Sequence, residues 1–175
     1  MTPRLIVRDH IIDDLDDYHN LISNPITMKY LFDVGTKDYE ESTKSLKDAI
    51  EQSNSTNRKR YFFAIIKKDT NEYIGEVGFT ILQTSPFGNK AELGYFIKKE
   101  FWNNGYTFEA AKAVLDFALA NLKIHKMISG CILDNIHSEK IIKKLGFKKE
   151  AHLVKHVYLL DKWLDRVEYG LINDN

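Results

Sequence analysis

The chain has 175 residues, of which 43% are hydrophobic and 29% charged, the size and composition of one globular domain. Its 25 basic residues balance 25 acidic ones, so the basic excess typical of nucleic-acid-binding proteins is absent and we expect no direct contact with nucleic acid. The single cysteine, Cys131, excludes an internal disulfide, and no apolar stretch has the length of a membrane span or the pattern of a signal peptide. We expect a cytoplasmic protein without membrane contact, folded as a single domain over residues 1–175.

The first third of the chain predicts one strand followed by helices. Residues 4–9 alternate apolar and charged side chains like a half-buried strand, and residues 13–23 have apolar side chains at helical spacing. Residues 25–32 begin with a proline after an asparagine and predict a second, short helix, and residues 40–52 predict a polar third one. An acidic cluster suits the first turn of the first helix, and it also suits a surface that attracts a cationic substrate. The cluster consists of Asp13, Asp14, Asp16 and Asp17.

The middle of the chain predicts three consecutive strands. Residues 60–68, 72–82 and 91–99 are rich in aromatic and β-branched side chains and are joined by short turn-like segments. Three strands with such short connections indicate an antiparallel meander.

The last third alternates between helix and strand patterns. Residues 106–122 predict an amphipathic helix, 126–133 a strand, 135–146 a helix and 147–173 two closing strands. A strand, a helix and a further strand in succession form a crossover and predict one parallel pair in an otherwise antiparallel sheet. We therefore expect an α+β fold, with a mixed, mainly antiparallel sheet of about seven strands and about four helices.

Gly105 stands where a strand pattern ends and a helix pattern begins. Asn104-Gly105 is a strong signal for a two-residue hairpin, but the helical period is already established at Phe108 and leaves no strand after the turn. A glycine directly before a helix leaves room for a ligand, and the first N–H groups of a helix lack partners inside it. Together with the helix dipole, such N–H groups form a site that can bind phosphate. The residues alone leave both a plain connection and an anion site open.

The sequence as a whole resembles the GNAT superfamily of acetyl-CoA-dependent N-acetyltransferases, and within it the RimJ/RimL-like enzymes that acetylate the N-termini of ribosomal proteins. The likeness covers nearly the whole chain in ordered segments, which are “PRLIVRD” (3–9), “ISNPITMKYL” (22–31), “YIGEVGF” (73–79), “AELGYFIKKEFWNNGYTFEAAKAVLDFAL” (91–119), “DNIHSEKIIKKLGF” (134–147) and “DKWLDRVEYGLI” (161–172). The resemblance implies a GNAT-like fold whose central parallel strands splay apart, and acetyl-CoA as cosubstrate.

The resemblance also implies where acetyl-CoA is bound. Residues 102–107 match the family's pyrophosphate loop, in which Gly105 fits the motif, whereas Trp102 and Thr107 replace the usual Gln or Arg and the usual Gly or Ala. The strand before this loop is implied to offer backbone groups to the pantetheine arm. The cofactor-binding residues expected here are Phe96, Ile97, Lys98, Asn103, Asn104, Gly105, Tyr106 and Thr107.

Residues 135–146 form the second stretch with a possible role. By residue type alone, Asn135 is a helix N-cap, and Gly146 followed by Phe147 is a C-terminal cap. The resemblance places Asn135 at the mouth of the strand splay, against an amide of the cofactor. It places Ser138 near the thioester sulfur as a catalytic hydrogen-bond donor, although a serine in the first turn of a helix is also commonplace.

Acetyl transfer to an amine requires a general base for the amine and a donor for the departing sulfur. Glu92 is a carboxylate within a strand pattern, where charge is uncommon, and the resemblance puts it on the strand that flanks the thioester. We expect Glu92 to be the catalytic base, acting through a water molecule. An exposed strand residue or a structural ion pair are the alternatives. Tyr158 is a second, weaker candidate for the acid.

We therefore expect an acetyl-CoA:amine N-acetyltransferase that moves the acetyl group directly to a protein N-terminal α-amine or a small-molecule amine. A ribosomal-protein N-terminus is among the candidate acceptors, and the enzyme is expected to be a monomer or a homodimer. The alternative is a non-catalytic module of the same fold that binds or senses acyl-CoA. His152 and His156 lie four apart in a strand pattern without a third ligand, so we expect no metal site.

Overall fold

The computed structural model describes residues 2–31 and 35–173, and one seven-stranded sheet runs through them. The spatial order of the strands is β1-β2-β3-β4-β5-β7-β6. Neighbouring strands are antiparallel except for β4 and β5, which are parallel. The strands are β1 (Leu5–Asp9), β2 (Arg60–Lys67), β3 (Glu72–Gln83), β4 (Asn89–Ile97), β5 (Ile124–Ile132), β6 (Lys148–Leu159) and β7 (Lys162–Ile172).

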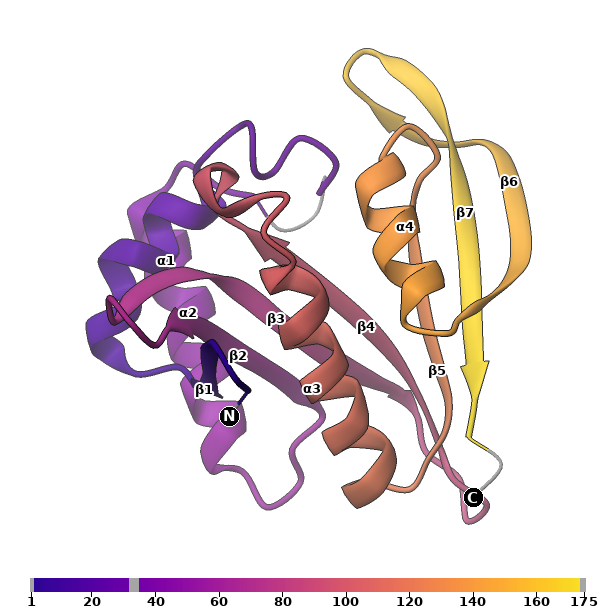
Figure 1. Cartoon of the computed structure of the whole chain (residues 1–175), viewed down its shortest axis with the longest axis horizontal. Helices are drawn as coiled ribbons and strands as arrows, with labels where there is room; N and C mark the ends of the chain where they lie inside the picture. Colours follow the sequence, from indigo (N-terminus) through magenta and orange to yellow (C-terminus); the bar gives the residue numbers. More distant parts are fainter. Residues whose placement is uncertain (1, 32–34, 174–175) are drawn as a thin grey trace.

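Four α-helices cover the sheet, and α3 is the crossover that joins the two parallel strands (Figure 1). In β2, Ile65 belongs to the apolar cluster that contains the buried side of α3, whereas Ala64 and Ile66 pack with Leu21 of α1. Since alternate strand residues point to opposite faces, α1 and α3 lie on opposite faces of the sheet. The helices are α1 (Leu15–Ile22), α2 (Tyr39–Asn54), α3 (Tyr106–Asn121) and α4 (Ile136–Lys144), with short 3-10 turns η1 (Ile12–Asp14) and η2 (Lys99–Phe101).

The sequence-based fold prediction is confirmed: the described residues form an α+β fold with seven strands, four helices and one parallel pair. The helix predicted to begin directly after Gly105 does begin at Tyr106. No helix in the described part of the chain is long and apolar enough to span a membrane.

The short helix expected over residues 25–32 is wrong for the residues that the structure describes, and Phe32 lies outside them. Residues 25–30 are a series of turns. Met28 packs into the cluster between α1 and α2, whereas Tyr30 packs against strands β5, β6 and β7 near Val157. Short helices are marginal on their own, so these two attachments to different parts of the protein prevail over local helix propensity.

The two parallel strands separate halfway along their length. The β4–β5 ladder ends at the pair Glu92 and Ile128, although both strands continue beyond it. Figure 1 shows the two strands together near the C-terminus of the chain and separating towards the opposite end. At the point of separation the buried hydroxyl of Ser129 donates to the carbonyl of Leu93 at 3.0 Å. This bond satisfies a backbone acceptor where the ladder stops.

A buried charge cluster attaches the segment before α1 to the sheet. The fully buried imidazole of His10 has its Nε2 2.9 Å from Glu76 Oε2 on β3 and its Nδ1 3.6 Å from Asp14 Oδ2. Arg8 holds the other side of Asp14 at 2.7 Å. Burial alone would lower the pKa of His10, but the Asp14 and Glu76 carboxylates outweigh it and raise the pKa to about 9. Asp14 is therefore structural, in agreement with the interpretation of the acidic cluster as part of a helix start.

The protein should become less stable as the pH rises and His10 loses its proton. Because its pKa is raised from 6.5 to about 9, the stabilisation is complete below pH 6.5 and is lost as the pH passes 9, on the order of 3 kcal/mol in all. Urea unfolding between pH 6 and pH 10 should show this decline in the wild type. His10→Gln, which retains a donor but not the charge, should be less stable at pH 6.5 and nearly independent of pH. A wild-type unfolding free energy that stays constant over this range would refute the assignment.

Candidate active site

The turn before α3 has a left-handed backbone at two positions and an open helix start. Asn103 has φ 62° and Gly105 has φ 78°. No side chain caps the first turn of α3, so its leading N–H groups, including those of Tyr106 and Thr107, remain available at the positive end of the helix dipole. Apart from the chain neighbours of Gly105, the described atom nearest to a Cβ built on it is an Arg4 nitrogen at 3.5 Å. This geometry fits a bound phosphate and excludes the hairpin alternative.

Trp102 has a structural contact that explains its departure from the motif. Its indole N–H donates to the carbonyl of Ile97, at the end of β4, at 2.9 Å. The side-chain amide of Asn104 then donates to the carbonyl of Trp102, also at 2.9 Å. These two hydrogen bonds fix the path of the chain between β4 and α3. The shape of the loop is thus maintained without the Gln or Arg usual at the first motif position.

The residues at the end of β4 differ in what they can offer a ligand. The side chain of Phe96 packs towards α1, so only its main chain can face the splay. The carbonyl of Ile97 accepts the indole bond described above. Lys98 donates its ammonium to Asp17 at 2.7 Å and its N–H to the carbonyl of Ile74 at 2.8 Å. We therefore keep Phe96 and Ile97 as proposed pantetheine contacts and leave Lys98 out.

Glu92 lies where the parallel ladder ends, on the face of the sheet opposite α3. Its neighbours Ala91 and Leu93 are both buried in the cluster beneath α3, so the carboxylate between them points the other way. The side chain is 40% exposed, and its Oε1 is 3.6 Å from a guanidinium nitrogen of Arg166. Arg166 is held in turn by Glu168 on the same strand, β7. An ion pair is therefore present, and the carboxylate also remains accessible to solvent.

Ser138 faces β4 across the splay, from the first turn of α4. The predicted N-cap is confirmed, because Asn135 Oδ1 accepts the N–H of Ser138 at 3.2 Å. The hydroxyl of Tyr95 donates to the carbonyl of Ser138 at 3.1 Å and lies 3.3 Å from its Oγ. Burial raises the pKa of Tyr95 well above its usual range, and burial also raises the pKa of the adjacent Cys131 thiol to about 11. Both groups are therefore protonated at neutral pH.

The arrangement fits an extended cosubstrate with an anionic end. Phosphates fit the open start of α3, and a narrow arm fits between the diverging strands β4 and β5. Lys144, in the last turn of α4, has its ammonium 4.1 Å from the ring centre of Phe108 and brings positive charge to the same end of α3. The thioester of acetyl-CoA would then lie between a hydroxyl pair on one face and a carboxylate on the other.

Comparison with known proteins agrees with this fold. Residues 4–148 match the family model described as “Acetyltransferase (GNAT) domain”, so the chain belongs to the GNAT acetyltransferases, which use acetyl-CoA as cosubstrate and transfer its acetyl group to amines.

Three similar proteins illustrate the range of the family. The N-acetyltransferase YnaD of Bacillus subtilis is 27% identical over 99% of this chain and 96% of its own length. The [Ribosomal protein uS5]-alanine N-acetyltransferase of Escherichia coli is 26% identical over 61% of this chain and 55% of its own length. The crystal structure of spermidine N-acetyltransferase from Vibrio cholerae in complex with CoA and spermine has a TM-score of 0.84 at 20% identity, covering 97% and 96% of the two chains. The expected family is thus confirmed, and its ribosomal-protein branch is among the relatives that the chain resembles.

Three residues of this region were missed by sequence reasoning. Tyr95 gave one usable signal, since it is a hydroxyl-bearing residue on the strand expected to splay. Ser129 and Arg4 gave none, because Ser129 acts through a backbone carbonyl on another strand and Arg4 is 100 residues away from the loop that it contacts.

His152, considered as a metal ligand, and Tyr158, considered as a catalytic acid, both contact residues outside the proposed site. His152 has its Nε2 2.7 Å from Asp165, and no group of three or more potential metal ligands occurs within residues 2–31 and 35–173. Tyr158 is 58% exposed and packs edge-on against Trp163 in the β6–β7 hairpin. Neither residue enters our proposal.

Gly105→Val should weaken the binding of CoA. A β-branched residue disfavours the positive φ of Gly105, and its Cβ would lie 3.5 Å from an Arg4 nitrogen, so valine should shift the turn that carries the open N–H groups. We expect Kd to rise by at least ~10-fold, equivalent to about 1.4 kcal/mol. Isothermal titration calorimetry measures this directly. Gly146→Val is the matched control, since Gly146 also has positive φ (95°) but terminates α4. Equal affinity of wild type and Gly105→Val would show that phosphate is not bound at this turn.

Proposed function

We propose that this enzyme acetylates a primary amine by direct transfer within a ternary complex, with a protein N-terminal α-amine as the first candidate acceptor. The observation that supports it best is the division of candidate groups between the two faces of the sheet. The phosphate loop and Ser138 belong to the face of α3 and α4, whereas Glu92 lies on the opposite face. Acceptor and cosubstrate would therefore approach the splay from opposite sides.

The proposed steps follow from this placement. Glu92, through a water molecule, takes a proton from the amine as its nitrogen forms a bond to the thioester carbonyl carbon. The carbon–sulfur bond then breaks, and the Ser138 hydroxyl donates a hydrogen bond to the departing thiolate. Tyr95 orients Ser138 through the bonds to its carbonyl and hydroxyl. Unpaired backbone N–H groups along the splayed part of β4 are suited to stabilise the oxyanion.

An α-amine is the acceptor that demands least of such a site. Its pKa is about 8, against about 10.4 for a lysine-like amine, so a larger fraction is neutral at pH 7. The similar proteins include both a ribosomal-protein enzyme and a spermidine enzyme, so a small polyamine is the second candidate. A cytoplasmic location belongs to the same proposal.

Acetyl-CoA turnover against a defined panel tests the function. The panel holds peptides with a free N-terminus, the same peptides with a blocked N-terminus and one lysine, and spermidine. We expect thiol release that depends on the acceptor, is fastest with free N-termini and yields a monoacetylated product by mass spectrometry. Cosubstrate binding without turnover on any amine would instead indicate a binding or sensing module.

Glu92→Gln should lower kcat by roughly 100-fold, the usual contribution of a general base, while the Kd of CoA stays close to that of the wild type. Glu168→Gln is the matched control, because it also removes a carboxylate beside Arg166 but stands on β7, opposite Gly130 of β5, and not on β4. If both variants lose activity equally, the charge around Arg166 matters and Glu92 is not the base.

A further inference from the structure

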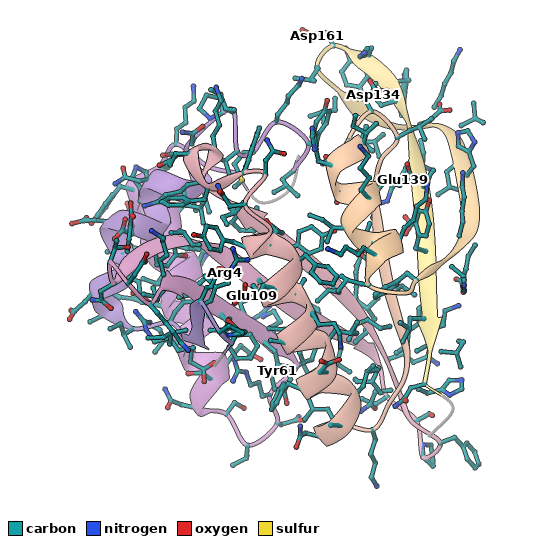
Figure 2. All side chains as sticks on the ribbon, in the orientation of Figure 1. Arg4, Tyr61, Glu109, Asp134, Glu139 and Asp161 are labelled. Atoms are coloured by element: carbon teal, nitrogen blue, oxygen red, sulfur yellow. The ribbon has the colours of Figure 1, made fainter. Side chains whose placement is uncertain are left out.

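The N-terminal segment is attached to the proposed phosphate loop by a single arginine. Arg4 lies next to β1, far from α3 in sequence, yet Figure 2 shows its side chain beside that of Glu109 on α3. Arg4 Nε donates to Glu109 Oε2 at 2.7 Å, and the main-chain N–H of Arg4 donates to Glu109 Oε1 at 2.9 Å. The hydroxyl of Thr2 donates to the same oxygen at 2.6 Å. Glu109 thus fixes both the backbone and the guanidinium of Arg4.

The remaining contacts of Arg4 are with the loop itself. Its Nη1 donates to the carbonyl of Asn104 at 3.0 Å, and its guanidinium lies 4.5 Å from the ring centre of Tyr106. Asn104 and Tyr106 flank Gly105, the residue with positive φ that precedes the helix. Arg4 therefore contacts the loop on both sides of its glycine.

The bond to Asn104 determines where the next N–H group points. In a trans peptide the C=O and the following N–H point in opposite directions, and no peptide bond in the described residues is cis. Since the carbonyl of Asn104 is directed at Arg4, the N–H of Gly105 is directed away from Arg4. Without the arginine this peptide plane would be free to rotate, because glycine accepts many backbone conformations.

The charge of Arg4 is already neutralised within the protein. Burial alone would raise the pKa of Glu109, but hydrogen bonds from Thr2 and Arg4 lower it, so the carboxylate stays ionised. Nε and Nη2 of Arg4 both lie 2.7 Å from Glu109 Oε2, and Nη1 is used by Asn104. Each of the three guanidinium nitrogens thus has one contact within the protein, which uses three of its five N–H donors and fixes its orientation. The charge is already paired with Glu109, which favours an indirect role over direct contact with phosphate.

We propose that Arg4 is a positioning residue, which orients the Asn104–Gly105 peptide so that its N–H faces the phosphates of acetyl-CoA. This inference rests on the proposed phosphate site at the start of α3. It adds a residue outside the loop motif, and it gives the N-terminal segment a part in cosubstrate binding.

Two acetyl donors separate this role from a general effect on stability. Acetyl-CoA reaches the loop with its pyrophosphate, whereas S-acetyl-pantetheine has no phosphate. Arg4→Gln should raise the Kd of CoA roughly ten-fold, the contribution of one charge-assisted hydrogen bond, and leave kcat/KM for S-acetyl-pantetheine unchanged. Arg4→Lys retains the charge but not the planar fork, and it should resemble Arg4→Gln. Equal loss with both donors, or full rescue by lysine, would overturn the inference.

The salt dependence of binding separates positioning from direct contact. A residue that contacts phosphate contributes to the dependence of Kd on ionic strength, whereas a positioning residue does not. We expect wild type and Arg4→Gln to have the same slope of log Kd against log salt concentration, and a shallower slope in the variant would refute positioning. Lys112→Gln is the matched control, because it removes a cation that pairs with Asp116 on the exposed side of α3.

Gly105→Val distinguishes failure of this inference from failure of the proposed site. If Gly105→Val weakens CoA binding and Arg4→Gln does not, the phosphate site stands and the role of Arg4 is wrong. If neither variant changes the affinity, phosphate is bound elsewhere and both proposals fail. Circular dichroism confirms that each variant is folded, as expected for an arginine side chain that is 48% exposed.

Discussion

The early end of the β4–β5 ladder is the constraint on which the rest of this structure depends. If the two parallel strands stayed hydrogen-bonded throughout, no room would remain for a ligand arm between them. Every backbone group of β4 that faces β5 would then be hydrogen-bonded to that strand. Here pairing stops at Glu92 and Ile128, and Ser129 closes the gap with a side-chain bond to Leu93. The backbone of β4 beyond that point does not pair with β5, and we propose that it contacts the pantetheine arm.

The candidate site is assembled around this separation from parts that are distant in sequence. The turn at Gly105 provides N–H groups at one end of the splay, and Ser138 with Tyr95 provides hydroxyls across it. Glu92 comes from the same strand as Tyr95 but faces the other way, towards Arg166. The N-terminal segment adds Arg4 to the back of the turn.

The sequence was sufficient for the fold and for the position of the helix starts, because both depend on local periodicity and on residues such as Gly105 and Asn135. It was insufficient where tertiary contacts decide. Residues 25–30 form turns because Met28 and Tyr30 pack against different elements. The ion pair between the Lys98 ammonium and Asp17 joins residues 81 positions apart and could not be predicted from the sequence. The roles of Arg4 and Ser129 depend on main-chain carbonyls, which leave no trace in the identity of the residue that carries them.

The central claim is that the phosphates of acetyl-CoA are bound by main-chain N–H groups at the start of α3. Backbone amide NMR during titration with CoA tests it most directly. We predict large, saturable shifts for the N–H resonances of Gly105, Tyr106 and Thr107, and much smaller shifts for the same resonances with S-acetyl-pantetheine. If these three resonances stay in place while others shift with CoA, the phosphates are bound elsewhere and the account is wrong.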